Sequence, residues 1–258
     1  MSLIISEKKD GVMTITMNRP EVYNSFNRAM ALEFQDVIGL AGADKTVRCI
    51  VITGAGKAFC AGQDLNEVVD PKGPPLHEIV SLHFNPIIWK IRDIEKPVVA
   101  AVNGVAAGAG ANIALACDIV IAKSSASFVQ AFSKIGLIPD SGGTYTLPRL
   151  IGYQKASALM MLGEKVTAEE AERLGMIYRY LPDAEFDQYI QSISVQLAQM
   201  PTRGLGLTKR ALNASTVNDL HAQLSIEEEL QTLAGGTKDY QEGVKAFLEK
   251  RKPEFRGE

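Results

Sequence analysis

Residues 135–144 read Ile-Gly-Leu-Ile-Pro-Asp-Ser-Gly-Gly-Thr, and the carboxylate of Asp140 is the most informative group in this stretch. Pro139 holds the backbone rigid just before the acid. Gly142 and Gly143 behind it carry no side chain that would shield it. The stretch stands where alternating strands and helices give way to helical periodicity. We therefore expect a strand-to-helix junction of an α/β chain that presents one carboxylate to a ligand.

Two turns rich in small residues lie upstream, each after a buried apolar run. Residues 59–64 read Phe-Cys-Ala-Gly-Gln-Asp, and residues 104–110 read Gly-Val-Ala-Ala-Gly-Ala-Gly. The second turn opens a helix, whose first N–H groups have no partner within the helix. The N–H groups of Gln63 and Ala109 form an oxyanion hole if they converge on one carbonyl oxygen. The structural alternatives are a tight turn for the first stretch and close helix–strand packing for the second.

Apolar runs separated by turn residues predict an α/β fold with crossover connections. From about residue 141 to the C terminus, a period of 3.6 predicts helices only, one of them capped at Thr167 with Glu170 three residues later. Further upstream, we expect strands at residues 11–17, 48–53, 96–102 and 118–122, and helices capped at Asn27, over 76–94 and over 109–117.

Composition excludes several classes of function. The 258 residues are 46% hydrophobic and 22% charged, and the net charge of −3 indicates neither a nucleic-acid partner nor an anionic membrane. No run of about 18 apolar residues predicts a membrane span, and no charged leader precedes an apolar segment. The three cysteines are odd in number, and the three histidines lack metal-ligand spacing. We expect a cytoplasmic protein with reduced cysteines and no metal.

Four blocks in a fixed order resemble the crotonase (enoyl-CoA hydratase/isomerase) superfamily: residues 57–65, 103–110, 117–119 and 136–144. The likeness continues to the ending at residues 242–251. It implies a spiral of ββα units over residues 1–195, which carries the active site, and a helical trimerisation region over residues 196–258. It also implies an acyl-CoA thioester substrate, no cofactor other than the coenzyme A that the substrate carries, and homotrimers that often pair into hexamers.

The same resemblance assigns expected roles to individual residues. Asp140, Gln63 and Ala109 are expected to be catalytic, with the last two as oxyanion donors. The loop from Ala61 to Asn66 is expected to lie along the CoA moiety. The residues expected to contact substrate or CoA are Ala61, Gln63, Asp64, Leu65, Asn66, Ala109 and Phe132, together with Phe247 and Lys250, which would reach toward a neighbouring subunit's CoA.

The superfamily's hydratases use two glutamates, and the corresponding positions here hold Asn112 and Phe132. Neither side chain is a general base at neutral pH, so two-glutamate hydration is disfavoured. Asp140 instead resembles the catalytic aspartate of the isomerase branch. An aspartate has an ordinary pKa of about 3.9, and apolar walls, expected from Phe132 and Ile138, would raise it. The alternative for Asp140 is an N-cap of the helix that starts near Ser141.

Several functions therefore remain open at the level of sequence. One carboxylate and an oxyanion hole suit a ring-epoxide thioester that expands to an oxepin. They suit equally a 3-enoyl thioester of fatty-acid oxidation whose double bond moves into conjugation. Residual hydratase activity is a third reading. A non-catalytic CoA-binding or RNA-binding member of the superfamily is a different class, and the acidic charge balance speaks against RNA.

Overall fold

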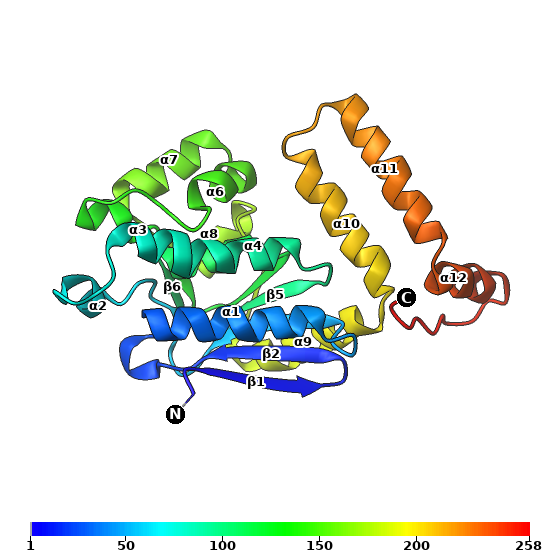
Figure 1. The fold of residues 1–258 in the computed structure, drawn as a ribbon, viewed down its shortest axis with the longest axis horizontal. Coiled ribbons are helices and arrows are strands. Elements are labelled where there is room, and N and C mark those ends of the chain that lie inside the picture. The colour runs from blue at the N-terminus through cyan, green and yellow to red at the C-terminus, as the bar shows by residue number, and fades with distance from the viewer. Residues whose placement is uncertain (1) are drawn as a thin grey trace.

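The computed structural model describes residues 2–258 and contains two β-sheets surrounded by helices (Figure 1). The larger sheet has six strands in the spatial order β1-β2-β3-β5-β7-β10. β1 runs antiparallel to β2, and all other neighbours are parallel. The strands are β1 (Ile4–Lys9), β2 (Val12–Met17), β3 (Cys49–Gly54), β5 (Val98–Val102), β7 (Ile119–Lys123) and β10 (Arg179–Leu181).

The smaller sheet has four strands in the order β4-β6-β8-β9. β4, β6 and β8 are parallel, and β9 runs antiparallel to β8. Strands of three residues are too short to show an alternating pattern, so the residue pattern alone does not predict this sheet. The strands are β4 (Ala58–Cys60), β6 (Val105–Ala107), β8 (Ser127–Val129) and β9 (Lys165–Thr167).

Helices make up most of the remaining chain. A π-helix (Ile79–Phe84) joins α3 to α4, and 3₁₀ turns occur at Pro20–Val22 and Ala131–Ile135. The α-helices are α1 (Arg28–Ala43), α2 (Leu65–Val69), α3 (Leu76–Glu78), α4 (Asn85–Asp93), α5 (Ala109–Ala116), α6 (Gly143–Ile151), α7 (Tyr153–Leu162), α8 (Ala168–Arg173), α9 (Asp183–Gln199), α10 (Thr202–Ser215), α11 (Leu220–Gly235) and α12 (Lys238–Leu248).

A ββα unit repeats along the chain. β3, β5 and β7 are neighbours in the larger sheet, and each is followed within a few residues by a strand of the smaller sheet. Those second strands, β4, β6 and β8, are neighbours too, and each leads into helices. The expected α/β spiral is therefore confirmed. The expectation of helices alone after residue 141 is wrong at β9 and β10, because these short strands form through pairing with β8 and β7.

Local signals placed several helix ends correctly. Asn27 accepts a hydrogen bond from the Met30 N–H at 2.9 Å and caps α1, and Thr167 accepts one from the Glu170 N–H at 3.2 Å and caps α8. The second half of the capping box does not form, since the Glu170 carboxylate pairs with Arg173. The expected helix over residues 76–94 is present, interrupted by the π-helical turn.

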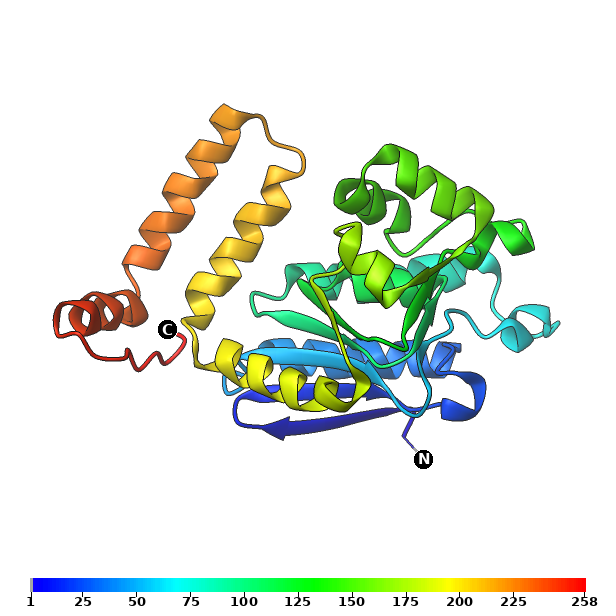
Figure 2. The ribbon, with the colours of Figure 1, turned by 180° about the vertical axis from the view of Figure 1, so that it is seen from behind.

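The larger sheet is covered on both faces. One face and the helices above it, including α1, α4 and α5, form the main apolar core. The other face packs on α9 through a smaller cluster that includes Val51, Val99, Ile121 and Phe186. Figure 2 shows α9 lying across that face of the sheet. Within residues 2–258, none of the helices combines the length and the apolar character needed to cross a lipid bilayer.

Helices α10 and α11 form an antiparallel pair that stands away from the sheets, with α12 at its foot (Figures 1 and 2). The predicted boundary between residues 195 and 196 falls inside α9, four residues before that helix ends at Gln199. α10 then begins at Thr202. The division of the chain into a core and an oligomerisation region stays a prediction.

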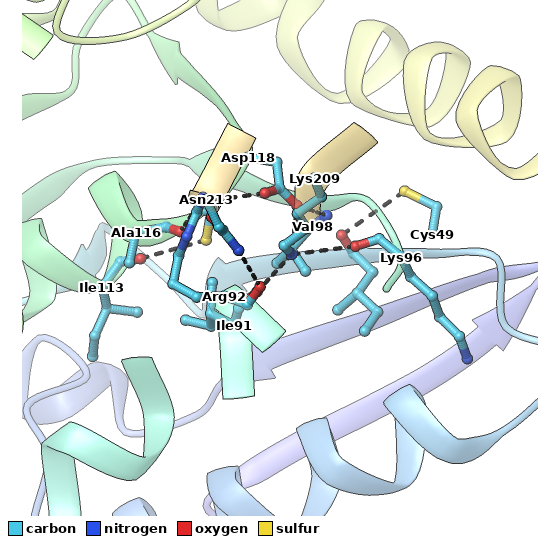
Figure 3. Close-up of polar contacts among 12 residues, drawn as sticks. Cys49, Ile91, Arg92, Lys96, Val98, Ile113, Ala116, Asp118, Lys209 and Asn213 are labelled. Carbon is cyan, nitrogen blue, oxygen red and sulfur yellow. Dashed lines mark hydrogen bonds and ion pairs between the residues drawn. The ribbon is translucent and has the colours of Figure 1, made fainter. Parts of the chain in front are cut away.

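An ionic group, in which the Lys209 side chain is buried and Asp118 and Arg92 are partly exposed, attaches α10 to the core (Figure 3). The Lys209 ammonium donates to Asp118 Oδ2 at 2.8 Å and to the carbonyl of Ile91 at 2.6 Å. Arg92 pairs with Asp118 Oδ1 at 3.3 Å and with the amide of Asn213 on α10. Burial lowers the pKa of Lys209, and the charge of Asp118 opposes this shift. The group joins α10, α4 and the start of β7.

We expect Lys209→Met to destabilise the protein by about 1–3 kcal/mol, because it removes a charged donor from Asp118 and from the Ile91 carbonyl. The urea midpoint of unfolding measures this change. Lys238→Met is the control: Lys238 pairs with Glu258 in an exposed position, and its loss should leave the midpoint unchanged. Equal midpoints for both variants would contradict the assigned anchoring role.

Candidate active site

Three parallel strands of the smaller sheet carry the candidate site at their carboxyl ends. Gln63 follows the end of β4 by three residues, Ala109 follows β6 by two, and Phe132 follows β8 by three. Because β4 pairs with β6 and β6 with β8 in parallel, these ends meet at one edge of the sheet. Crevices at the carboxyl ends of parallel strands are common ligand sites. Pairing within the smaller sheet thus brings together residues from three separate segments.

The backbone N–H of Gln63 points away from the strand beside it. Gln63 forms an isolated parallel bridge with Phe26, in which the Phe26 N–H donates to the Gly62 carbonyl and the Asp64 N–H donates to the Phe26 carbonyl. Since successive N–H groups of an extended chain face opposite sides, the Gln63 N–H faces away from Phe26. Within residues 2–258, no acceptor takes this N–H.

The Ala109 N–H is the first of α5 and likewise has no acceptor among the residues that the structure describes. Gly108 before it has φ 54° and ψ −128°, close to the first central position of a type II′ turn, which glycine alone adopts readily. A β-carbon at Gly62 would lie 3.2 Å from the Ala109 nitrogen. The two turns are therefore in direct contact, and two unpaired N–H groups lie near each other at the positive end of a helix.

Asp140 lies in a turn and does not cap a helix. Its carbonyl accepts from the Gly143 N–H at 2.8 Å, and the two central residues, Ser141 and Gly142, have φ of 50° and 74°. α6 begins at Gly143, and no side chain caps it. The alternative reading of Asp140 as an N-cap is therefore wrong. Within residues 2–258, the carboxylate accepts one side-chain hydrogen bond, from the Ser141 hydroxyl at 2.9 Å. It therefore retains capacity to accept a proton or further hydrogen bonds.

Burial raises the pKa of Asp140, and hydrogen bonds from Ser141 and from the backbone oppose this shift. A raised pKa makes a carboxylate a stronger base. Of the two expected walls, Phe132 is buried, and its ring tip would lie 3.8 Å from a β-carbon at Gly108. Ile138 is 81% exposed in the chain, so that expectation is wrong: the connection before Pro139 runs along the surface.

Asn112 joins the turn of Asp140 to α5. Its Nδ2 donates to the Asp140 carbonyl at 2.8 Å, and its Oδ1 accepts from Gln130 Nε2 at 2.8 Å. Asn112 and Gln130 are both fully buried. Asn112 stands one helical turn after Ala109, so the aspartate turn lies close to the two N–H groups. The sequence shows only that Asn112 stands where the superfamily's hydratases have a glutamate. It gives no indication of these two hydrogen bonds.

Polar contacts of Asp64 hold the loop from Ala61 to Asn66, and several other side chains of the loop are exposed. Asp64 pairs with Arg19 at 2.9 Å, and its other oxygen accepts from the Asn66 N–H at 3.1 Å and caps α2. Ala61, Leu65 and Asn66 are exposed. The carboxylate of Asp64 therefore shapes the loop, and contacts of this loop with CoA stay a prediction.

The two predicted residues near the C terminus lie elsewhere in the chain. Phe247, at the end of α12, is 83% exposed, and Lys250 just beyond it is exposed as well. Figure 1 shows α12 at the foot of the α10–α11 pair, far from α6. A role for them at a CoA site needs a second subunit and stays a prediction.

Cysteine chemistry is limited near this site. Cys60 lies beside the Gln63 turn, but burial raises the pKa of its thiol to about 12, so it is a protonated, non-nucleophilic group. All three cysteines are free and buried, as predicted. Within residues 2–258, no cluster of His, Cys, Asp and Glu side chains is arranged to hold a metal ion. The groups that this edge of the sheet brings together are one carboxylate and two backbone N–H groups.

The chain belongs to the enoyl-CoA hydratase/isomerase family, whose sequence model matches residues 7–258. It is 49% identical to 1,2-epoxyphenylacetyl-CoA isomerase of Escherichia coli, with 100% of this chain and 99% of that protein covered. It is 35% identical to trans-2-decenoyl-[acyl-carrier-protein] isomerase of Streptococcus mutans over 98% of each. A crystal structure of enoyl-CoA hydratase from Bacillus anthracis superposes with a TM-score of 0.92 at 32% identity, covering 100% of both chains. The protein is thus an enzyme with the crotonase fold.

We predict that Ala109→Pro strongly lowers turnover while CoA affinity stays near that of wild type. Proline fits the first position of a helix, so α5 should persist, but the variant lacks the N–H donor. Loss of one oxyanion donor costs roughly 2.7–4 kcal/mol, about 10²–10³-fold in kcat. Steady-state kinetics with inhibition by free CoA measure both quantities. Ala109→Ser keeps the N–H and is the control; an unchanged kcat for Ala109→Pro would contradict the assignment.

Proposed function

We propose that this enzyme is an acyl-CoA isomerase that uses Asp140 as a proton shuttle and the N–H groups of Gln63 and Ala109 as an oxyanion hole. The observation that carries the proposal is the state of Asp140: a partly buried carboxylate with a raised pKa, whose backbone carbonyl is bound by Asn112, one helical turn after Ala109. Asn112 and Phe132 occupy the positions that carry glutamates in the family's hydratases, and neither is an acid.

The chemistry follows from the acidity of a carbon beside a thioester carbonyl. The carboxylate of Asp140 takes a proton from that carbon, and the electron pair moves onto the carbonyl oxygen. The N–H groups of Gln63 and Ala109 stabilise this enolate oxygen. Asp140 then returns the same proton to a different carbon. Atoms and electrons are conserved, so the net reaction is an isomerisation that consumes neither water nor a cofactor.

The particular substrate we propose is 1,2-epoxyphenylacetyl-CoA, an intermediate of phenylacetate breakdown, converted to an oxepin thioester. The 49% identity over the full length to an enzyme of that name supports this choice. The C–C bond shared by the epoxide and the six-membered ring breaks while both C–O bonds stay, which gives a seven-membered oxepin ring. The proton that Asp140 takes from the carbon beside the thioester carbonyl is returned to a ring carbon. The second candidate is a 3-enoyl thioester, whose double bond moves by the same proton transfer. The similarity to a decenoyl isomerase favours keeping it.

The assembly we propose is a homotrimer, or a hexamer formed by two trimers, in the cytoplasm. Large apolar side chains are exposed along the α10–α12 region, among them Leu212, Leu224, Phe247 and Leu248. Exposed apolar faces of this extent are typical of contact surfaces between proteins. In such an assembly, Phe247 and Lys250 would approach the CoA of a neighbouring subunit.

We expect Asp140→Asn to lower kcat about 10²–10⁴-fold on both the epoxide and the 3-enoyl thioester, because the amide cannot accept the proton. The matched control is Asp187→Asn, which removes an exposed carboxylate on α9 and should keep full activity. Comparing kcat/KM for the two thioesters in the wild type ranks the substrates. Turnover that survives Asp140→Asn would overturn the proposed mechanism, and water addition to crotonyl-CoA in that variant would favour a hydratase.

The pH profile should report the buried base. Asp140 acts when deprotonated, so kcat/KM should rise with pH through the pKa of Asp140 in the free enzyme. Since burial raises that pKa, the acid limb should lie above the ordinary value of about 3.9 for an aspartate. A profile of kcat/KM for the wild type tests this. An acid limb at or below the ordinary value would contradict the assignment of a buried aspartate base.

A further inference from the structure

We propose that Asn112 is a positioning residue that holds the turn of Asp140 and thereby aims its carboxylate, an inference that rests on the proposed function. Asn112 is on α5, 28 residues before Asp140, and its Nδ2 donates to the Asp140 carbonyl at 2.8 Å. α5 also supplies the Ala109 N–H at its first position. One helix therefore carries both a donor for the enolate oxygen and the bond that places the base.

Only one orientation of the Asn112 side-chain amide fits this contact. The Asp140 carbonyl can only accept, so the amide of Asn112 must turn its NH₂ group toward it. The Oδ1 of Asn112 then faces Gln130, which must present its own NH₂ group and does so at 2.8 Å. This arrangement leaves Gln130 Oε1 without a partner in a buried position within the described chain. An unpartnered buried oxygen is costly, and here it accompanies a fixed orientation of Asn112.

The turn that Asn112 holds adopts an unfavourable backbone. Ser141 has a φ of 50°, in the left-handed region that few non-glycine residues occupy. Such residues persist where their surroundings over-determine them, and they cluster at active sites. The hydrogen bond from the Asn112 amide to the Asp140 carbonyl supplies that restraint. The amide also packs directly against the start of α6, since a β-carbon at Gly143 would lie 2.4 Å from Asn112 Nδ2.

The chemistry of an amide at position 112 suits this role and excludes a carboxylate. An ionised carboxylate there has no hydrogen to donate, and it would face the Asp140 carbonyl oxygen at close range. It would also add a negative charge near the base. A neutral donor avoids both effects. The residue that stands where the family's hydratases have a glutamate thus restrains the base and takes no part in proton transfer.

The test compares Asn112→Leu, which keeps the volume but lacks the donor, with the wild type and Asp140→Asn. We expect kcat to fall about 10²-fold, the loss that a misplaced reacting group of about 1 Å produces. Inhibition by free CoA should stay unchanged, because the CoA loop is untouched. The acid limb of kcat/KM should also move to lower pH, since a released turn exposes the Asp140 carboxylate to water.

A second variant perturbs the same contact from the start of α6. Gly143→Ala places a methyl group against Asn112 Nδ2 and should displace the amide without changing its chemistry. It should lower kcat and move the acid limb in the same direction as Asn112→Leu. It also keeps the test decisive if Asn112→Leu fails to fold. Asn213→Leu is the matched control: it removes a part-buried amide that bonds the Arg92 carbonyl, and it should cost stability without moving the acid limb.

The outcomes separate the two proposals. If Asp140→Asn is inactive while Asn112→Leu and Gly143→Ala keep kcat within about twofold of wild type, the positioning role is wrong and the proposed function stands. The role is also wrong if kcat falls with an unmoved acid limb, as a loss of folded enzyme alone would cause. If Asp140→Asn itself retains wild-type isomerase activity, the proposed function is overturned and the role of Asn112 with it.

Discussion

Parallel pairing of three very short strands is the constraint on which the candidate site depends. β4, β6 and β8 each contribute only three residues, yet their pairing places three carboxyl-terminal turns at one edge. The turns can approach closely because their backbones carry little bulk, as the 3.2 Å between a β-carbon at Gly62 and the Ala109 nitrogen indicates. The alternation of an extended chain then decides that the Gln63 N–H faces away from Phe26.

Helix α5 connects the two halves of the chemistry. Its first N–H belongs to Ala109, and one turn later the side chain of Asn112 holds the carbonyl of Asp140. In the proposed mechanism, one of the two donors to the enolate oxygen and the backbone of the base are thus attached to one rigid element. Such preorganisation matters, because electrostatic stabilisation of a transition state requires dipoles that are already in place before charge develops.

The α10–α12 region is attached to the core by a different kind of interaction, an ion pair. The buried Lys209 ammonium pairs with the partly exposed Asp118 at the root of α10, and backbone carbonyls accept its remaining hydrogens. A charge-assisted hydrogen bond of this kind gives a directional attachment that an apolar contact lacks. The α10–α11 pair then presents large exposed apolar side chains away from the core. These exposed side chains are thus separate from the edge of the smaller sheet that carries the candidate site.

The sequence by itself determined the features that depend on neighbouring residues. It placed the caps at Asn27 and Thr167, the two small-residue turns and the acid of Asp140, because capping and turn geometry are local. Only the tertiary structure decided that a second sheet exists, that Ile138 is exposed, and that Asn112 bonds a carbonyl 28 residues away. Three-residue strands have no periodicity to read, and an amide carries no mark of its partner. The short strands and the hydrogen bond of Asn112 form only when segments distant in the sequence pack together.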